Sequence, residues 1–489
     1  MNKLITTPIY YVNGEPHIGH IYTSIAADIL GRWERINNRK VLVSFGTDEH
    51  GQKVELAAGK ANCTPEEFVE SMHKPFANLL NLFNIEGDVF VRTTSNMHKK
   101  AATEVYSRLV ESGLTYSGNY SGWYSRVDEA FYKEEEIIDG VHKDTGSKVE
   151  WIEEPCTFFK LSAMKEKLAK FYAENPDSIA PKQRYSEVMG LLKSDLPDLA
   201  ITRSRFKWGI AVPDEPGQVM YVWVDALSNY LTAINYPRNL RYKEWWNNVT
   251  HLMGKDILKF HAIYWPAILI AIGLEPPKRI YAHGWWSVDG QKMSKSLGNV
   301  INPIDLLEQY DVDHIRYYLF REMPFGHDGS FSISSLKNTV NVELANEVGN
   351  LVQRVLTFCY NKYGTTVVPS SLQEEILFDW DQARVDSEKF LSQQDISGYL
   401  NCIREKVINT NKYIDHEKPW SSEKHVEIMG VLCMCIQRMA LLYYPVIPSK
   451  SKKILSMLGV YNNSIDESWN ILCEFPLAKP EPIFCKYLG

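Results

Sequence analysis

The sequence predicts an α/β protein in which a parallel, Rossmann-like sheet domain carries an inserted domain and is followed by an all-α helical bundle. From residue 1 to about 290, short apolar β-branched runs alternate with helical stretches, which is the pattern of parallel strands joined by crossover helices. Between about 113 and 215 the chain becomes rich in Tyr, Trp, Gly and turn residues, which indicates an insertion. After about 336, apolar residues recur at every third or fourth position, which predicts helices.

Each element follows from its own segment of sequence. The expected strands of the sheet are Leu4–Val12, Lys40–Phe45, Val89–Arg92, Val249–Met253 and Arg279–Ala282. The first stripe of the bundle consists of Leu336, Val340, Leu344, Val348, Leu351, Val355 and Cys359. We place the sheet domain at 1–112 and 216–290, the inserted connective domain at 113–215, a lysine-loop region at 291–335 and the helical domain at 336–489.

Composition bounds the class of protein. The chain has 489 residues, 45% hydrophobic and 23% charged, which excludes intrinsic disorder as the main state. The net charge of −7 gives no support to a broad basic surface, although local patches can still attract polyanions. The run His261–Leu274 is shorter than the ~18–20 residues of a membrane span, so we expect no membrane contact. Eight cysteines without a C-x-x-C pair, and no secretory pattern at the start, predict a reducing, cytoplasmic location.

A first candidate site lies at residues 16–20, Pro-His-Ile-Gly-His, just before the amphipathic stretch Ile21–Ile36. We expect Pro16 at the first helical position, where its missing N–H costs nothing. His17 and His20 are three residues apart and share one face of the first turn. Their N–H donors at a helix N-terminus suit phosphate oxygens, and Gly19 leaves room for a base or ribose. Two surface histidines, or a metal-binding pair, are the competing interpretations.

A second candidate site follows Gly284 and runs through Lys292, Met293, Ser294 and Lys295. Small residues around two lysines are typical of a loop that closes on a polyphosphate, where each ammonium acts as a point charge. A solvated lysine turn is the competing interpretation.

The two motifs together resemble the paired signature of the class I aminoacyl-tRNA synthetases. The segments Thr7–Gly14, Gly46–Lys53, Ser204–Ile210 and Tyr221–Ala226 are similar to the methionyl-tRNA synthetase family within that class. The resemblance implies activation of L-methionine by ATP, with Mg²⁺ accompanying the ATP, followed by transfer of methionine to the terminal ribose of tRNA(Met). It assigns catalysis to His17, His20, Lys292 and Lys295, and ATP binding to His17, Gly19, His20, Gly284, Lys292, Met293, Ser294 and Lys295.

The same resemblance assigns a methionine pocket. Its members are Ile9, Tyr11, Asp48, Trp223, Ala226, Leu227, Tyr230, His261 and Trp265. Spacing alone favours ordinary core for the aromatic members, and Asp48 also fits a helix cap. Aromatic walls suit a thioether through weak sulfur–aromatic contacts, and a carboxylate suits the substrate's ammonium group. A missing methyl group is worth only ~1–3 kcal/mol in such a pocket, so we expect imperfect discrimination against homocysteine.

For the helical domain the resemblance implies anticodon recognition by Asn350, Arg354 and Trp420. An amide, a guanidinium and an aromatic ring suit unpaired bases. A solvated polar face and a half-buried Trp at a helix start are equally compatible with the spacing.

The sequence departs from the family in two ways. Many members carry zinc-binding cysteines in the inserted domain, but here that region contains only Cys156, so we expect no structural zinc. Some members also carry a C-terminal tRNA-binding barrel, for which this chain is too short, and we expect a monomer. Another class I synthetase or a non-catalytic tRNA-binding paralogue are the alternatives.

Overall fold

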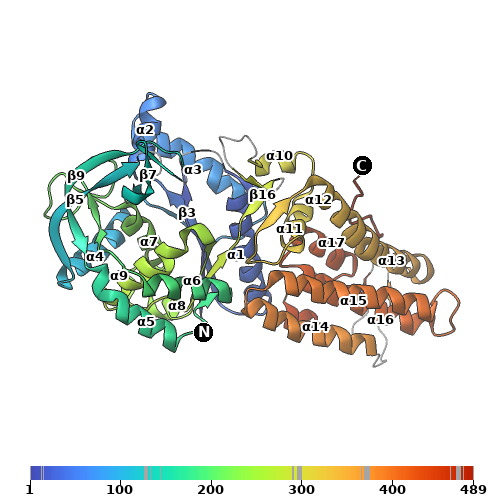
Figure 1. The fold of residues 1–489 in the computed structure, drawn as a ribbon. Helices are drawn as coiled ribbons and strands as arrows, with labels where there is room; N and C mark the ends of the chain where they lie inside the picture. Colours follow the sequence, from blue (N-terminus) through green and yellow to red (C-terminus); the bar gives the residue numbers. More distant parts are fainter. Residues whose placement is uncertain are drawn as a thin grey trace. The chain divides into compact units, whose positions relative to one another are not determined.

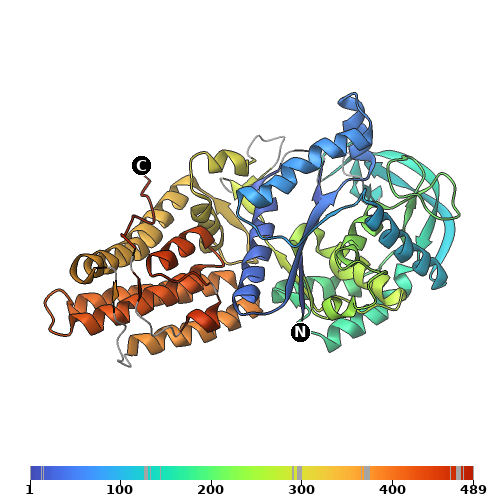
Figure 2. The same cartoon turned by 180° about the vertical axis from the view of Figure 1, so that it is seen from behind.

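The computed structural model describes residues 2–12, 14, 16–125, 130–132, 134–143, 145–288, 291–293, 300–364, 366–367, 375–462, 464–469, 475–476 and 478–487. The chain folds as two compact units (Figures 1 and 2). Unit 1 comprises residues 1–16, 42–81 and 87–282, and unit 2 comprises residues 17–41, 82–86 and 283–489.

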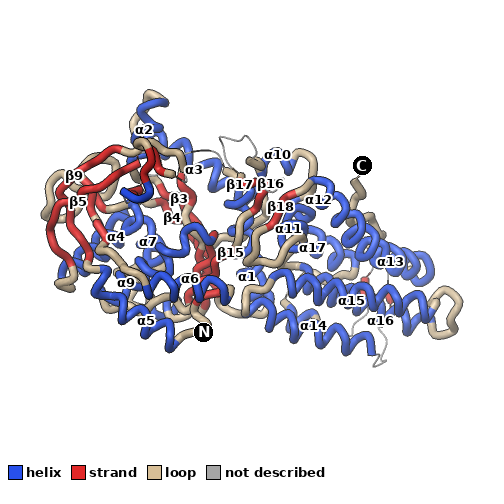
Figure 3. The backbone as a smooth tube through the Cα atoms, viewed as in Figure 1, coloured by secondary structure: helices blue, strands red, loops and turns tan. Residues whose placement is uncertain are grey.

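Unit 1 is built on a seven-stranded sheet, which is the predicted α/β fold (Figure 3). The strand order is β10-β15-β14-β1-β3-β2, with β4 paired to β3. The pairings β1–β14, β10–β15, β2–β3 and β3–β4 are all parallel. The bounds are β1 (Lys3–Thr6), β2 (Tyr10–Tyr11), β3 (Val41–Asp48), β4 (Val89–Arg92), β10 (Ile179–Ala180), β14 (Val249–Gly254) and β15 (Arg279–His283).

The predicted strand Leu4–Val12 is wrong in its extent. The structure divides it into β1 and β2, because the chain leaves its place beside β14 and then runs beside β3. Pro8 lies in the interruption, where it has no N–H to donate to a neighbouring strand.

The helices of unit 1 enclose one apolar core, to which α4, α7 and α9 each contribute. They are α2 (Gln52–Lys60), α3 (Pro65–Leu82), α4 (Asn96–Glu111), α5 (Lys165–Glu174), α6 (Lys182–Lys193), α7 (Val222–Thr232), α8 (Lys243–Trp246) and α9 (Trp265–Ala271).

The turn-rich segment of unit 1 forms a four-stranded sheet in the order β11-β9-β5-β6. The long strands β5 and β9 pair antiparallel from Thr115↔Phe159 to Tyr124↔Glu150. The strands here are β5 (Thr115–Ser125), β6 (Ala130–Tyr132), β7 (Ile137–Ile138), β8 (Val141–His142), β9 (Glu150–Phe159), β11 (Leu199–Ala200), β12 (Thr202–Arg203) and β13 (Val219–Met220).

Unit 2 contains the helical bundle, as predicted, and also helix α1 (Ile18–Ile36). A buried ionic cluster holds α1: the carboxylate of Asp28 accepts hydrogen bonds from Arg32 at 2.8 Å and from Arg316 of α11 (Val312–Arg321) at 2.6 Å. Because all three side chains are nearly inaccessible to solvent, removing one partner would leave a buried charge uncompensated. Arg316 also donates to the carbonyls of Pro445 and Val446.

The other elements of unit 2 are short strands and mostly long helices. The strands are β16 (Trp286–Val288), β17 (Gln291–Lys292), β18 (Gly329–Phe331), β19 (Thr366–Val367) and β20 (Phe475–Pro476). The helices are α10 (Pro303–Leu307), α11 (Val312–Arg321), α12 (Ile333–Thr339), a π-helical stretch (Val340–Gly349), α13 (Asn350–Tyr363), α14 (Glu375–Ser392), α15 (Ile396–Glu417), α16 (His425–Tyr443), α17 (Pro448–Met457) and α18 (Ile465–Ser468).

Helix α16 is buried on nearly all sides. Within the described part of the chain it is the one helix that is long and apolar enough to cross a membrane. Of its most apolar 18 residues, 89% are buried inside the protein. Because the core helix of a soluble bundle meets the same criteria, these properties alone are weak evidence for a membrane span.

Candidate active site

The first turn of α1 is closed by its two histidines. His17, not Pro16, is the N-cap, and the helix begins at Ile18. The Nδ1 atom of His17 accepts the N–H of Gly19 at 3.2 Å, while Nδ1 of His20 accepts the N–H of His17 at 3.2 Å. The expectation of Pro16 at the first helical position is therefore wrong, because the imidazoles satisfy N–H groups that a cap residue must satisfy.

This reciprocal cap determines the tautomer of both rings. A ring nitrogen that accepts a hydrogen bond carries no proton, so Nε2 carries the proton in each neutral imidazole. The two rings stack with their centroids 3.7 Å apart. The arrangement thus presents two Nε2–H donors from the first turn of one helix, which is the chemistry that phosphate oxygens require.

Two glycines of the predicted ATP site have a packing reason to be glycine. A Cβ at Gly19 would lie 3.0 Å from Nδ1 of His17, so a side chain would disturb the cap. A Cβ at Gly284 would lie 2.1 Å from the carbonyl oxygen of His327, which leaves no space for one.

The N-terminal half of α1 lies beside segments from far downstream in unit 2. Thr23 shares a 2.7 Å hydrogen bond with Nε2 of His283. The N–H of Ile18 donates to the carbonyl of Ile301 at 3.1 Å. Ile301 follows the lysine motif, so the chain on the far side of that motif contacts the first turn of the histidine helix.

The lysine motif itself is described only in part. The backbone of Lys292 belongs to β17, and Met293 follows it as a partly buried residue. Ser294 and Lys295 lie outside the described residues, as does the Lys292 side chain. Their predicted roles stay predictions.

Four of the predicted methionine residues meet in an aromatic cluster of unit 1. The hydroxyl of Tyr230 lies 2.6 Å from Nε2 of His261, and the Tyr230 and Trp265 rings are 6.3 Å apart. Trp223 contacts His261 edge-on at 6.1 Å and stacks at 3.8 Å on Phe260, which the sequence analysis did not select.

His261 is neutral, and the donor and acceptor roles of its two ring nitrogens can be assigned. Burial lowers the pKa of His261 to about 4. Its Nδ1 lies 3.0 Å from the carbonyl of Ile257 and must donate to it, so Nε2 accepts. The Tyr230 hydroxyl therefore donates its proton to His261, and its oxygen keeps lone pairs for any further partner.

A third histidine, His251, completes this cluster and was missed by the sequence analysis. Its Nδ1 shares a 2.6 Å hydrogen bond with Thr6, and its ring stacks on Tyr230 at 4.1 Å. Its buried Nε2 has no hydrogen-bond partner among the residues that the structure describes. The alternation of side chains along β14 predicts that His251 shares a face of the sheet with Val249 and Met253. It does not predict the partner of His251 in β1.

The remaining predicted methionine residues lie at the strands and on α7. Tyr11 of β2 is in register with Asp48 of β3, so these two are neighbours in the sheet. Ile9 packs where a side chain at Gly46 would be. Ala226 and Leu227 are buried on α7.

In unit 2, two of the three predicted anticodon residues are in contact. The guanidinium of Arg354 lies over the ring of Trp420, 5.5 Å from its centroid, and pairs with Asp415 at 2.8 Å. Trp420 is 50% exposed, and Asn350 is exposed one turn before Arg354 on α13. The arrangement offers an accessible aromatic face beside a cation.

The chain matches one family of known proteins over most of its length. The family model described as tRNA synthetases class I (M) matches residues 3–142 and 132–356. The chain is 44% identical to the methionine–tRNA ligase of Rickettsia felis, over 93% of this chain and 92% of the relative, and 40% identical to that of Rhizobium meliloti, over 99% and 98%. The chain belongs to the class I methionyl-tRNA synthetases.

Solved structures of methionyl-tRNA synthetase agree. A Mycobacterium tuberculosis methionyl-tRNA synthetase bound by methionyl-adenylate superposes with a TM-score of 0.95 at 38% identity, covering 99% of this chain and 100% of that chain. These matches confirm the family resemblance and the fold class.

This synthetase also contains a buried carboxylate that the sequence analysis missed. Asp225 of α7 accepts hydrogen bonds from Nδ1 of His50 and Nε2 of His98, both at 2.7 Å. Burial alone would raise the pKa of Asp225, but the two histidines hold it well below its ordinary value. Asp225 therefore ties α7, which carries Trp223 and Tyr230, to the segment after Asp48.

The expectation of no structural zinc concerns the inserted segment, which the structure describes except at residues 126–129, 133 and 144. Among the described residues no group of three or more His, Cys, Asp or Glu side chains is arranged to hold a metal ion. Cys156 is buried in β9, and burial raises the pKa of its thiol to about 11, which opposes the thiolate that zinc needs.

Proposed function

We propose that this chain is a methionine–tRNA ligase. It activates L-methionine with ATP to methionyl-adenylate and pyrophosphate, and then transfers methionine to the 3′-terminal ribose of tRNA(Met). The methionine–tRNA ligase relatives, and the methionyl-adenylate named with the M. tuberculosis structure, support this reaction.

One observation carries the proposal for the nucleotide site. The hydrogen bond from Ile18 to Ile301 joins the capped histidine turn to the chain that follows the lysine motif. A site for ATP phosphates needs hydrogen-bond donors and cations close to one another. The contact between Ile18 and Ile301 supports this arrangement, because it brings the chain after the lysine motif to the histidine turn.

The chemical step follows from charge and position. A carboxylate oxygen of methionine attacks the α-phosphorus, the bond from that phosphorus to the bridging oxygen breaks, and pyrophosphate leaves. Mg²⁺ bound to the ATP would offset part of the charge on the phosphates. The Nε2–H donors of His17 and His20 stabilise charge at the α/β region. Lys295 neutralises the leaving pyrophosphate, and Lys292 supports the loop and the phosphates.

The aromatic cluster is the proposed methionine site, with Asp48 binding the ammonium group. Because Tyr230 donates its proton to His261, its hydroxyl oxygen has none to offer a ligand, and the aromatic walls suit an uncharged thioether. In a site of this kind, methionine and homocysteine differ in binding free energy by little more than the contribution of one methyl group.

The remaining proposals concern the whole chain. We propose the domain boundaries given above, anticodon contacts by Asn350, Arg354 and Trp420, a cytoplasmic monomer and no structural zinc. Metal analysis of the purified chain tests the last point, since one zinc per chain would overturn it.

Amino-acid-dependent ATP–pyrophosphate exchange across the twenty amino acids tests the function. Methionine should support exchange far above the others, and equal exchange with leucine or valine would assign a different class I synthetase. Lys295→Ala should slow exchange by at least about 100-fold while tRNA binding stays nearly unchanged. Lys182→Ala, which removes an exposed lysine from α6, is the matched control and should leave exchange intact.

A further inference from the structure

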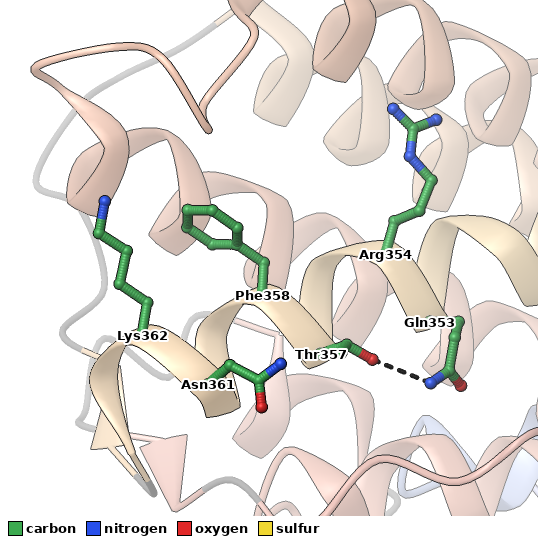
Figure 4. Close-up of a pocket in the computed structure, with 6 residues that line it drawn as sticks. All are labelled: Gln353, Arg354, Thr357, Phe358, Asn361 and Lys362. Carbon is green, nitrogen blue, oxygen red and sulfur yellow. Dashed lines mark hydrogen bonds between the residues drawn. The ribbon is translucent and has the colours of Figure 1, made fainter.

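Helix α13 carries a hollow that extends past the predicted anticodon residues (Figure 4). The hollow has a volume of about 740 Å³, and all its lining residues come from this one helix: Gln353, Arg354, Thr357, Phe358, Asn361 and Lys362. Residues four apart on a helix lie above one another, so these six form two parallel rows of three. One row is cationic and aromatic, and the other carries amides and a hydroxyl.

The first row repeats the chemistry of the Arg354–Trp420 pair. The ammonium of Lys362 lies 5.3 Å from the centroid of the Phe358 ring, much as the guanidinium of Arg354 lies 5.5 Å from that of Trp420. Arg354 and Lys362 are eight residues apart, which is ~12 Å along the helix. The two cation–aromatic pairs therefore stand side by side with room for more than one nucleotide.

The ring of Phe358 packs against a second aromatic ring of the bundle. Its ring contacts Tyr363 edge-on at 6.1 Å, and the Tyr363 hydroxyl shares a hydrogen bond with His425 of α16. Phe358 itself is only partly buried, and Lys362 is exposed. A partly buried aromatic ring with an exposed cation beside it suits stacking on a base and contact with its phosphate.

The second row supplies polar groups along the same hollow. The Gln353 amide donates to the Thr357 hydroxyl at 2.9 Å, and Asn361 presents an exposed amide one turn further on. Amides and hydroxyls at this spacing suit the edges of unpaired bases. An acidic peptide would need several cations and would make no use of the aromatic face, so the observations favour a nucleotide.

We propose that Phe358 and Lys362 form a second nucleotide platform, which holds an unpaired anticodon-loop nucleotide of the tRNA next to the one held by Arg354 and Trp420. The inference rests on the proposed function, since it takes tRNA as the substrate. It adds two residues that the resemblance does not assign.

The test measures binding of tRNA(Met), and of its isolated anticodon stem-loop, to the full chain. Phe358→Ala should weaken both by about 5- to 150-fold, the usual range for loss of one stacked base, and Phe358→Trp should restore most of the affinity. Lys362→Ala should weaken both and lower the slope of log Kd against log salt by about 0.7, as for one lost phosphate contact on a single strand. Phe378→Ala, at a 57% exposed phenylalanine of α14, is the matched control and should bind as the parent chain does.

Methionine-dependent exchange, measured on the same samples, separates the possible failures. If the parent chain lacks exchange, the proposed function fails, whatever the binding results. If exchange is intact and Phe358→Ala or Lys362→Ala binds the stem-loop as tightly as the parent chain, the platform does not exist. If Phe358→Ala also loses exchange, it has misfolded, and Lys362→Ala and Phe358→Trp then decide the matter.

Discussion

The aromatic cluster of unit 1 and the surface of α13 use similar side chains in opposite surroundings. Tyr230, His261 and Trp265 are at most 1% exposed, and hydrogen bonds fix which ring nitrogen carries each proton. Trp420, by contrast, is 50% exposed, and the guanidinium of Arg354 lies over its ring. A buried cluster is arranged before a small ligand arrives, whereas an exposed one can adjust to a large and flexible polymer.

The difference in burial predicts a difference in what mutations change. In the cluster, stability and methionine binding should fall together, because the same contacts serve both. On α13, tRNA binding should fall while stability stays constant. Four measurements test this contrast.

Trp265→Ala should have the largest effect. The side chain is fully buried against Trp246 and Tyr230, so its removal should cost about 3–5 kcal/mol of unfolding free energy and abolish methionine-dependent exchange. Urea unfolding measures the first quantity and pyrophosphate exchange the second. A variant as stable as the parent chain would show that the cluster is not a packed core.

Acid should destabilise unit 1 through His261. Its pKa falls from 6.5 in the unfolded chain to about 4 in the folded one, so between these values the unfolded chain binds more protons. Stability should decrease as pH falls from 6.5 to about 4, by about 3 kcal/mol from this residue, and not further below that. His251 shifts in the same direction.

The control for the acid effect is His261→Gln, which keeps an acceptor for Tyr230. Its unfolding free energy, measured in urea between pH 7 and pH 4, should depend less on pH than that of the parent chain. Identical slopes for the two proteins would contradict the assignment of a neutral His261.

Tyr230→Phe should have an intermediate effect. It removes the donor to Nε2 of His261 and leaves that buried acceptor unsatisfied, at a cost of about 1–3 kcal/mol. We expect a raised KM for methionine and an unchanged KM for ATP in the exchange assay. A change in the ATP constant alone would place Tyr230 outside the methionine site.

Trp420→Ala should leave the fold almost untouched. Exposed substitutions usually change stability by less than about 0.5 kcal/mol, and methionine-dependent exchange should stay as in the parent chain. Aminoacylation of tRNA(Met) should fall about tenfold or more, because one stacked base is lost. Loss of exchange would move Trp420 away from the proposed anticodon surface.

Much of the fold was predictable because its elements are local. Alternating apolar runs gave the parallel strands Val89–Arg92 and Val249–Met253 within a residue, and three- and four-residue spacing gave the bundle helices. The extent of the first strand was not predictable in this way. Whether the chain at Pro8 continues beside β14 or moves to β3 depends on partners that are distant in sequence.

The sequence did not reveal His251 and Asp225 for the same reason. His251 is held by Thr6, 245 positions away, and Asp225 by His50 and His98, more than 120 positions away. No sequence pattern around a single buried histidine or aspartate reveals partners that are so distant along the chain. Aromatic residues near them were found only because the resemblance to a family assigned them.

The order of residues along the chain specifies which side chains are available: two imidazoles at the start of a helix, two lysines far downstream, and rings at helical spacing. Which nitrogen of each imidazole carries the proton depends instead on the folded chain. In His17 and His20 a backbone amide donates to Nδ1 and leaves the proton on Nε2, whereas in His261 the carbonyl of Ile257 keeps the proton on Nδ1. These contacts exist only once the chain has folded.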